Sequence, residues 1–178
     1  MVTHNGLHGT WSEDQASAMF IIFTGVAGAG KTTVGKLLAK ELSWRFYEGD
    51  DFHPAANVEK LRRGEPLTDD DRRPWLDTLR DVIQAALERG ENGVLACSAL
   101  KRSYRARLRV SERVIFVHLA AGPDVIQRRL ERREGHFMNP SLIESQFATL
   151  ETPQAALSLD ASLPPDVLVQ QVRQALSI

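Results

Sequence analysis

A glycine-rich segment near the start of the chain constrains the fold more than any other feature. It follows a continuous apolar run at 19–24 and precedes a stretch at 34–42 in which apolar residues recur at helical spacing. The segment matches the pattern G-x-x-x-x-G-K-[ST] at every position, with Gly25, Val26, Ala27, Gly28, Ala29, Gly30, Lys31 and Thr32. A strand, this turn and a helix, in that order, predict a phosphate-binding P-loop in an α/β fold.

The residue types of this turn suit the binding of phosphate. Glycines let consecutive backbone N–H groups converge on phosphate oxygens, and the helix N-terminus adds the positive end of its dipole. Lys31 can reach the terminal phosphates of ATP, and the Thr32 hydroxyl can ligate Mg²⁺. We therefore expect ATP and Mg²⁺ as cofactors, held by Gly25, Gly28, Ala29, Gly30, Lys31, Thr32 and Thr33. An ordinary glycine-rich turn is disfavoured because strand, turn and helix are all in register.

The rest of the chain alternates short apolar runs with amphipathic stretches, which predicts a three-layer α/β/α fold around a five-stranded parallel sheet. The expected strands lie at 19–24, 46–50, 94–97, 114–119 and 157–159. A long helix is expected from about Leu76 to about Gly90, after a polar segment at 69–75. A chain of 178 residues fits one domain. We assign that domain to 19–178 and interpret 1–18 as a disordered extension.

Charge and cysteine content exclude several kinds of partner. Lys and Arg total 22 against 23 for Asp and Glu, so neither nucleic acid nor an anionic membrane is expected as a partner. No apolar run approaches the ~20 residues of a membrane span, and 1–18 lack the pattern of a secretory signal. The single cysteine, Cys97, cannot form an intrachain disulfide and suits a reducing cytoplasm.

Polar residues after the second expected strand suggest a site for an acceptor. Glu48 and Asp50 lie two apart at a strand end, so both can face the phosphates and accept a hydroxyl proton or hold a Mg²⁺-bound water. His53, Asn57 and Lys60 are spaced at three and four residues, and on a helix they would form one polar face able to bind several hydroxyls. Taken alone, His53 is better explained as a surface or capping histidine than as a functional residue.

Four segments together resemble the gluconokinase family. Residues 49–60 resemble its G-D-x-x-H-P-x-x-N-x-x-K motif, and 64–76 resemble its G-x-P-L-x-D-x-D-R-x-P-W-L motif. Residues 97–105 resemble its C-S-A-L-K-R-x-Y-R motif, and 135–147 resemble its lid and the helix that follows. The segments occur in the family's order, and the resemblance runs from about residue 20 to the C-terminus.

The resemblance implies an ATP:D-gluconate 6-phosphotransferase with a core like that of nucleoside monophosphate kinases, and a homodimer. By position, Asp50 would orient or deprotonate the 6-hydroxyl, and Arg72 would suit the carboxylate because a guanidinium can hold it with two hydrogen bonds. The substrate-binding candidates are Asp50, His53, Asn57, Lys60, Arg72 and Lys101, in a segment at about 50–76 and after the third strand. In a lid at about 128–140, Arg129 would lie against the adenine and Arg133 near the transferring phosphate.

The chain departs from this pattern in places, and two other functions are open. Ser98 stands where many P-loop proteins carry an aspartate, so the second Mg²⁺ contact falls to Glu48 or Asp50 through water. The loop after Glu151 is shorter than in the family, and Asn139 is an added or altered lid residue.

One alternative is another small-molecule kinase, for shikimate or a nucleotide, which the segments at 53–57 and 71–76 disfavour. The other is a non-catalytic nucleotide-binding module, which the complete P-loop and the acidic pair disfavour.

Overall fold

The computed structural model describes residues 18–131 and 140–178. Most of the expected N-terminal extension and most of the expected lid, including Arg133 and Asn139, lie outside the described residues. Among the described residues, no helix is both long and apolar enough to cross a membrane.

The centre of the molecule is a parallel five-stranded sheet, as predicted. The strands are β1 (Phe20–Thr24), β2 (Arg45–Glu48), β3 (Gly93–Ala96), β4 (Val114–Ala120) and β5 (Leu157–Asp160). Their order across the sheet is β2-β3-β1-β4-β5, and every neighbouring pair is parallel. The central strand β1 is buried along its whole length, which explains why it reads as an uninterrupted apolar run.

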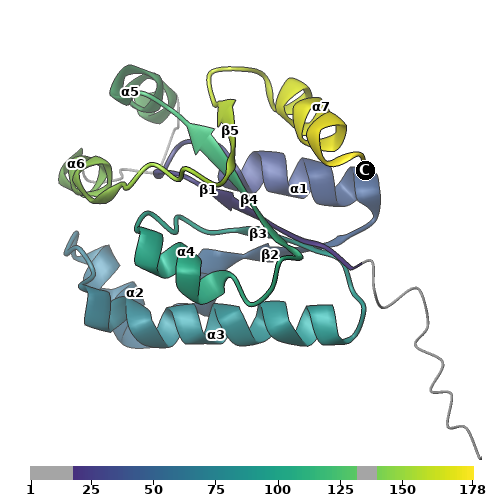
Figure 1. The fold of residues 1–178 in the computed structure, drawn as a ribbon. Coiled ribbons are helices and arrows are strands. Elements are labelled where there is room, and N and C mark those ends of the chain that lie inside the picture. Colours follow the sequence, from purple (N-terminus) through teal and green to yellow (C-terminus); the bar gives the residue numbers. More distant parts are fainter. Residues whose placement is uncertain (1–17, 132–139) are drawn as a thin grey trace, which may run out of the picture.

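Helices cover both faces of the sheet. They are α1 (Lys31–Leu42), α2 (Ala55–Arg62), α3 (Asp69–Glu88), α4 (Arg102–Leu108), α5 (Pro123–Glu131), α6 (Pro140–Thr149) and α7 (Pro165–Leu176), with a short 3₁₀ turn, η2 (Gly49–Phe52). In Figure 1, α1 and α7 lie on one face of the sheet, and α3 and α4 lie on the other. The remaining helices, α2, α5 and α6, gather at the end of the sheet to which the strands point.

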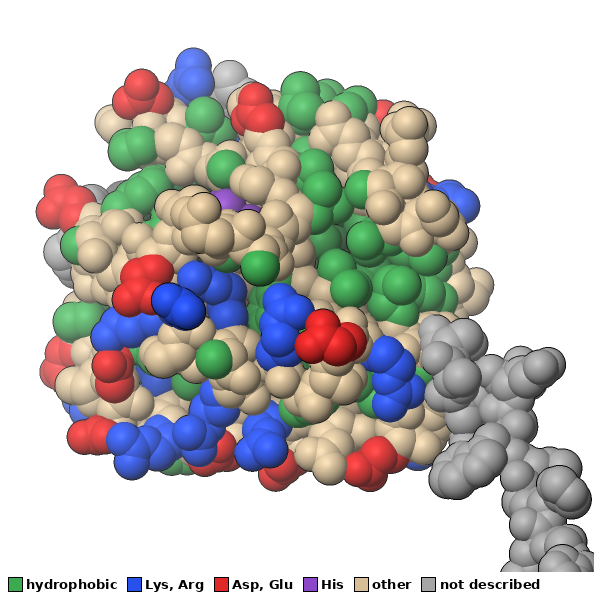
Figure 2. All heavy atoms as spheres, in the orientation of Figure 1, with side chains coloured by type: hydrophobic (Ala, Val, Ile, Leu, Met, Phe, Trp, Pro, Cys, Tyr) green, Lys and Arg blue, Asp and Glu red, His purple; other side chains and the backbone are tan. Residues whose placement is uncertain are grey.

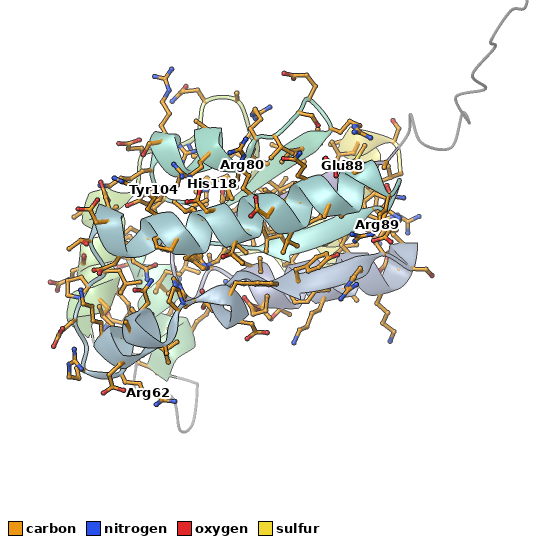
Figure 3. The ribbon with its side chains drawn as sticks, turned by 90° about the horizontal axis from the view of Figure 1, so that it is seen from below. Arg62, Arg80, Glu88, Arg89, Tyr104 and His118 are labelled. Atoms are coloured by element: carbon orange, nitrogen blue, oxygen red, sulfur yellow. The ribbon has the colours of Figure 1, made fainter. Side chains whose placement is uncertain are left out.

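Successive side chains of β1 pack into two apolar layers, one on each face of the sheet. Phe20 and Ile22 pack into the layer under α3 and α4, whereas Ile21 and Phe23 pack into the layer under α1 and α7. Figure 3 looks onto the α3 side of the molecule, with the exposed residues Arg80 and Glu88 labelled along that helix. Both faces of the sheet are therefore buried under helices, as is usual for an all-parallel sheet.

The start of α3 differs from the prediction. The helix begins at Asp69 and not at about Leu76, so the polar segment expected to precede it forms its first two turns, with Pro74 inside the helix. A capping box explains the early start. The Thr68 hydroxyl accepts from the backbone N–H of Asp71 at 3.2 Å, and the Asp71 carboxylate accepts from the backbone N–H of Thr68 at 2.9 Å. The prediction was wrong because it relied on apolar periodicity, which was recognised only from Leu76 onwards.

The strand order places a crevice at the end of the sheet. The chain leaves β1 for β2 on one side and reaches β4 on the other, so β1 and β3 flank a point where the winding reverses. In open α/β sheets ligands bind at the carboxyl ends of the strands at such a point. The glycine-rich turn after β1 and the loop after β3 both end there.

The packing predicts the effect of shortening a core side chain. Ile83 on α3 is fully buried, so Ile83→Ala should lower the free energy of unfolding by about 2–5 kcal/mol because a cavity remains. The exposed Arg80 on the same helix supplies the control, since Arg80→Ala should change stability by about 0.5 kcal/mol or less. Urea denaturation measures both. Equal effects of the two substitutions would contradict the assigned orientation of α3.

Candidate active site

The glycine-rich turn connects β1 to α1 with the backbone geometry that phosphate binding needs. Gly25, Gly28 and Gly30 have φ angles of 138°, 80° and 101°, which residues with a Cβ rarely adopt. A Cβ at Gly25 would also lie 2.7 Å from the carbonyl oxygen of Leu119. Because α1 begins at Lys31, directly after the turn, the positive end of its dipole lies where an anion can bind.

A cleft of about 730 Å³ opens in front of this turn. Its walls come from the turn itself, the ends of β2 and β3, the segment that joins α2 to α3, and α6. The polar and aromatic lining residues are Lys31, Thr32, Thr33, Glu48, Asp50, His53, Arg62, Arg63, Arg72, Trp75, Ser98, Ser145 and Gln146. The structure thus brings the predicted P-loop, the acidic pair and two of the predicted acceptor residues, His53 and Arg72, into one cavity.

Thr32 and the acidic pair form the side of the cleft next to the phosphate-binding turn. The Thr32 hydroxyl donates to Glu48 Oε2 at 2.8 Å. Burial raises the pKa of the Glu48 carboxyl, although the hydrogen bond from Thr32 opposes this, and the nearby Asp50 raises it further. Asp50 is different, because its side chain is 81% exposed and open to the cleft. The two carboxylates therefore have separate environments, one held by the P-loop and one free to meet a ligand.

The oxygens of Thr32 and Glu48 are suited to Mg²⁺. This ion prefers hard oxygen ligands and usually keeps waters and phosphate oxygens beside one or two protein groups. Within 18–131 and 140–178, no group of three or more His, Cys, Asp or Glu side chains could hold a metal on its own. A magnesium ion here would accordingly be shared between these two residues and a bound nucleotide.

His53 and Arg72 form the opposite wall of the cleft. The His53 ring stacks on Trp75 with a centroid distance of 4.3 Å and an interplanar angle of 17°. Trp75 is itself fixed, because its Nε1–H donates to the carbonyl oxygen of Gly49 at 2.7 Å. Arg72 donates through Nη1 to the carbonyl oxygen of Leu67, which holds the guanidinium at the cleft. This wall offers a hydrogen-bonding ring and a cation to an acceptor.

Asn57 and Lys60 share a helical face, as predicted, but that face packs against α3. Asn57 is 4% exposed and donates to the carbonyl oxygen of Asp71 at 2.8 Å. Lys60 Nζ lies 2.8 Å from both carboxylate oxygens of Asp71. Neither residue is among those that line the cleft. Their contacts dock α2 onto the first turn of α3.

Lys101 is engaged in a similar way. Its Nζ lies 2.7 Å from both carboxylate oxygens of Asp69, which also accepts a hydrogen bond from the Tyr104 hydroxyl. Lys101 does not line the cleft either. The first turn of α3 thus presents two carboxylates, Asp69 and Asp71, and each holds a lysine that the sequence suggested for the acceptor.

Arg129 lies against the glycine-rich turn. Its Nη1 donates to the carbonyl oxygens of Gly28 and Ala29 at 3.2 and 2.9 Å, and its Nη2 donates to the carbonyl oxygen of Ala161. These bonds tie α5 and the segment after β5 to the P-loop. The predicted contact of Arg129 with adenine stays a prediction, and the other lid arginine, Arg133, lies outside the described residues.

The sequence did not single out two residues that organise the site. Gln146 on α6 accepts a hydrogen bond from the backbone N–H of Ala27 at 2.7 Å, which links α6 to the P-loop. Arg105 is buried and donates to the carbonyl oxygens of Ala99, Leu100 and Glu151 at 2.8–2.9 Å. Arg105 is the last residue of the motif at 97–105, and Gln146 lies in the segment 135–147. The family resemblance therefore covered both residues without giving either of them a role.

The cysteine that follows β3 is poorly suited to act as a nucleophile. Cys97 is buried at the back of the cleft, and burial raises the pKa of its thiol to about 12. The thiolate, which is the reactive form, is therefore nearly absent at neutral pH.

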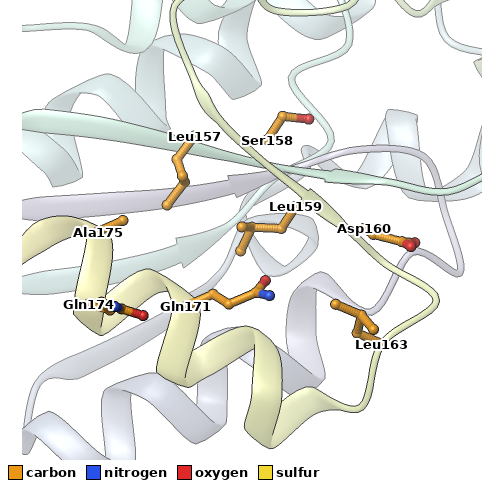
Figure 4. Close-up of a pocket in the computed structure, with 8 residues that line it drawn as sticks. All are labelled: Leu157, Ser158, Leu159, Asp160, Leu163, Gln171, Gln174 and Ala175. Carbon is orange, nitrogen blue, oxygen red and sulfur yellow. The ribbon is translucent and has the colours of Figure 1, made fainter.

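A second hollow of about 420 Å³ lies between β5 and α7. Figure 4 shows its lining, which includes Leu157, Leu159 and Leu163, and Asp160 is the one ionisable residue on it. Figure 2 shows hydrophobic side chains gathered beside α7, and mixed charges over α3 and α4. The phosphate-binding turn and the acidic pair line the larger cleft and not this hollow, which makes the larger cleft the candidate active site.

Known proteins resemble the chain over most of its length. Residues 27–158 match the sequence profile of the shikimate kinase family. A gluconokinase of Gluconobacter oxydans is 47% identical over 157 residues, covering 86% of this chain and 88% of that protein. A gluconokinase of Arabidopsis thaliana is 37% identical over 177 residues, covering 90% of this chain and 94% of that protein.

Solved structures agree with these relatives. A gluconokinase from Sinorhizobium meliloti superposes with a TM-score of 0.82 at 38% identity, covering 89% of this chain and 91% of that chain. A shikimate kinase from Bacteroides thetaiotaomicron superposes with a TM-score of 0.66 at 23% identity, covering 90% of this chain and 99% of that chain. At that lower identity the likeness shows a common fold.

The capping box of α3 generates a pH-dependent prediction. Hydrogen bonds from Lys60 and Thr68 lower the pKa of Asp71 from its ordinary 3.8 to about 2. The ionised carboxylate therefore stabilises the fold at neutral pH, and this contribution is lost as the pH falls from about 4 towards about 2. Asp71→Asn should lower the urea midpoint at neutral pH, and its difference from wild type should shrink across that acidic window. A difference that does not change with pH would contradict the assignment.

Proposed function

Because the chain belongs to the gluconokinase family, we propose that it transfers the γ-phosphoryl group of ATP to the 6-hydroxyl of D-gluconate. The products are 6-phospho-D-gluconate and ADP. The observation that supports this most is the shared cleft, in which the P-loop faces an exposed carboxylate and a wall of His53 and Arg72. ATP, Mg²⁺ and a sugar acid are the ligands that these groups can hold together.

The phosphate side of the cleft binds and neutralises charge. The backbone N–H groups of the turn and Lys31 would hold the phosphate oxygens, and Thr32 and Glu48 would hold the metal ion. Bound Mg²⁺ supplies positive charge that offsets the charge on the transferring group. Such pre-positioned donors stabilise charge that develops during transfer, and this is the main contribution that an enzyme makes to phosphoryl transfer.

Asp50 orients the acceptor hydroxyl. Its exposed carboxylate lies in the cleft. Glu48, in contrast, is half-buried and accepts a hydrogen bond from the Thr32 hydroxyl. A carboxylate that accepts the hydroxyl proton typically contributes about 10²–10⁴-fold to the rate. On the opposite wall, Arg72 suits the gluconate carboxylate, since a guanidinium binds it through two parallel hydrogen bonds, and His53 binds a hydroxyl.

Asn57, Lys60 and Lys101 contribute to the site indirectly in this proposal. Their polar atoms are engaged by Asp71 and Asp69 at the start of α3, the helix that also carries Arg72. Direct contact of these three residues with gluconate stays a prediction from the family resemblance. So do the roles of Arg129 and Arg133 at the nucleotide, the homodimer and the cytoplasmic location.

A panel of acceptors separates this function from its rivals. ADP release is measured with Mg-ATP and D-gluconate, shikimate, a nucleoside monophosphate or no acceptor. We expect ADP release only in the reaction that contains D-gluconate as the acceptor. Turnover with shikimate instead would support the rival suggested by the shikimate kinase profile. ATP binding without any turnover would favour the non-catalytic module.

The role of Asp50 is tested with its neighbour as the matched control. Asp50→Asn should lower kcat with gluconate by about 10²-fold or more, because the amide cannot accept the proton. Asp51 is exposed in the same 3₁₀ turn and is absent from the cleft lining, so Asp51→Asn should stay close to wild type. Equal losses in the two variants would contradict a specific role for Asp50.

A further inference from the structure

The orientation of the Asn57 amide follows from its buried partner. Asn57 Nδ2 lies 2.8 Å from the backbone carbonyl oxygen of Asp71. A carbonyl oxygen can only accept a hydrogen bond, so the side-chain atom that faces it has to be the NH₂ group. The amide is 4% exposed, which removes water as an alternative partner for this end of the side chain.

The same NH₂ group sets the protonation of its neighbour. Asn57 Nδ2 also lies 3.4 Å from Nδ1 of His53. An amide nitrogen donates and does not accept, so His53 Nδ1 has to present its lone pair to it. In a neutral imidazole the proton is then on Nε2. We infer that Asn57 is a positioning residue that holds His53 as the Nε2–H tautomer, with this N–H group directed to the acceptor side of the cleft.

Three contacts fix the ring that carries this proton. Trp75 stacks on the ring and sets its plane, and the Nε1–H of Trp75 is anchored on Gly49. Asn57 then sets the rotation of the ring within that plane. Nε2 is the nitrogen that faces Asp50, with 4.0 Å between Nε2 and Oδ1. The His53 side chain is 7% exposed, so little water competes for it.

The charged groups around the ring are consistent with a neutral histidine. Burial lowers the pKa of His53, the Arg72 guanidinium lowers it further, and Asp50 raises it. The contact with Asn57 also favours the neutral ring, because both nitrogens of an imidazolium would be donors and Nδ1 could not receive the Asn57 N–H.

The tautomer assigns different tasks to His53 and Asp50. With Nδ1 occupied and Nε2 protonated, His53 has no lone pair for a hydroxyl proton and acts as a hydrogen-bond donor. A hydroxyl oxygen that lies between the two side chains can accept from His53 Nε2–H and donate to Asp50. This role at the acceptor rests on the proposed function, whereas the tautomer itself follows from the contacts of Asn57 alone.

Nitrogen NMR of the histidine rings in the full-length wild-type protein tests the tautomer directly. At neutral pH we expect the His53 signals of a neutral ring with the proton on Nε2. The signal is identified by its loss in His53→Gln, and the buried His118 serves as a reference in the same spectrum. A proton on Nδ1, or on both nitrogens, would overturn the inference.

Asn57→Asp separates positioning from simple structural support. The carboxylate has the same shape but no hydrogen to donate, so His53 Nδ1 should become protonated and donate to it, while the His118 signals stay unchanged. kcat with gluconate should fall by about tenfold or more, as removal of one oriented donor typically does, with KM for ATP unaltered.

An unchanged His53 tautomer in a folded variant would refute the role of Asn57. If the variant does not fold, the wild-type spectrum decides. An Nε2–H ring in a protein inert towards gluconate would refute the proposed function and leave the tautomer standing.

Discussion

The turn between β1 and α1 is the constraint on which the other parts of the site depend. A buried central strand has to end and a helix has to begin within a few residues, and the positive φ angles of Gly25, Gly28 and Gly30 make this possible. No side chain fits at Gly25, because a Cβ there would press on the carbonyl oxygen of Leu119. Once the turn is fixed, Arg129 from α5 and Gln146 from α6 bond to it from the sides. The cleft lies between the turn, α6 and the end of β3.

The first turn of α3 is a second point of organisation, on the acceptor side. The Asp71 carboxylate accepts hydrogen bonds from Lys60, and the backbone carbonyl oxygen of Asp71 orients the Asn57 amide. Asp69 receives Lys101 from the start of α4. Besides the stability that the ionised Asp71 contributes at neutral pH, these ion pairs have a geometrical consequence. They hold three elements around Arg72 and His53, which are then presented to the cleft by a rigid support.

The fold was largely predictable because buried parallel strands leave apolar runs in the sequence, and all five were found. The start of α3 was missed because the capping box of Thr68 and Asp71 is polar and carries no apolar period. The spacing of Asn57 and Lys60 gave their common face correctly, but spacing cannot say what packs against a face. The bond between Ala27 and Gln146 joins residues 119 positions apart, and only the folded chain reveals it. The P-loop was found in full because its function is contained in one contiguous segment.

The central claim is that the cleft directs phosphoryl transfer to one hydroxyl of gluconate. It is tested most directly by a phosphorus–proton correlation NMR spectrum of the product made from ATP and D-gluconate. Coupling of the new phosphorus signal to the two protons on the terminal hydroxymethyl carbon is the predicted result. A phosphate on any other carbon, or inorganic phosphate as the sole new signal, would contradict the account.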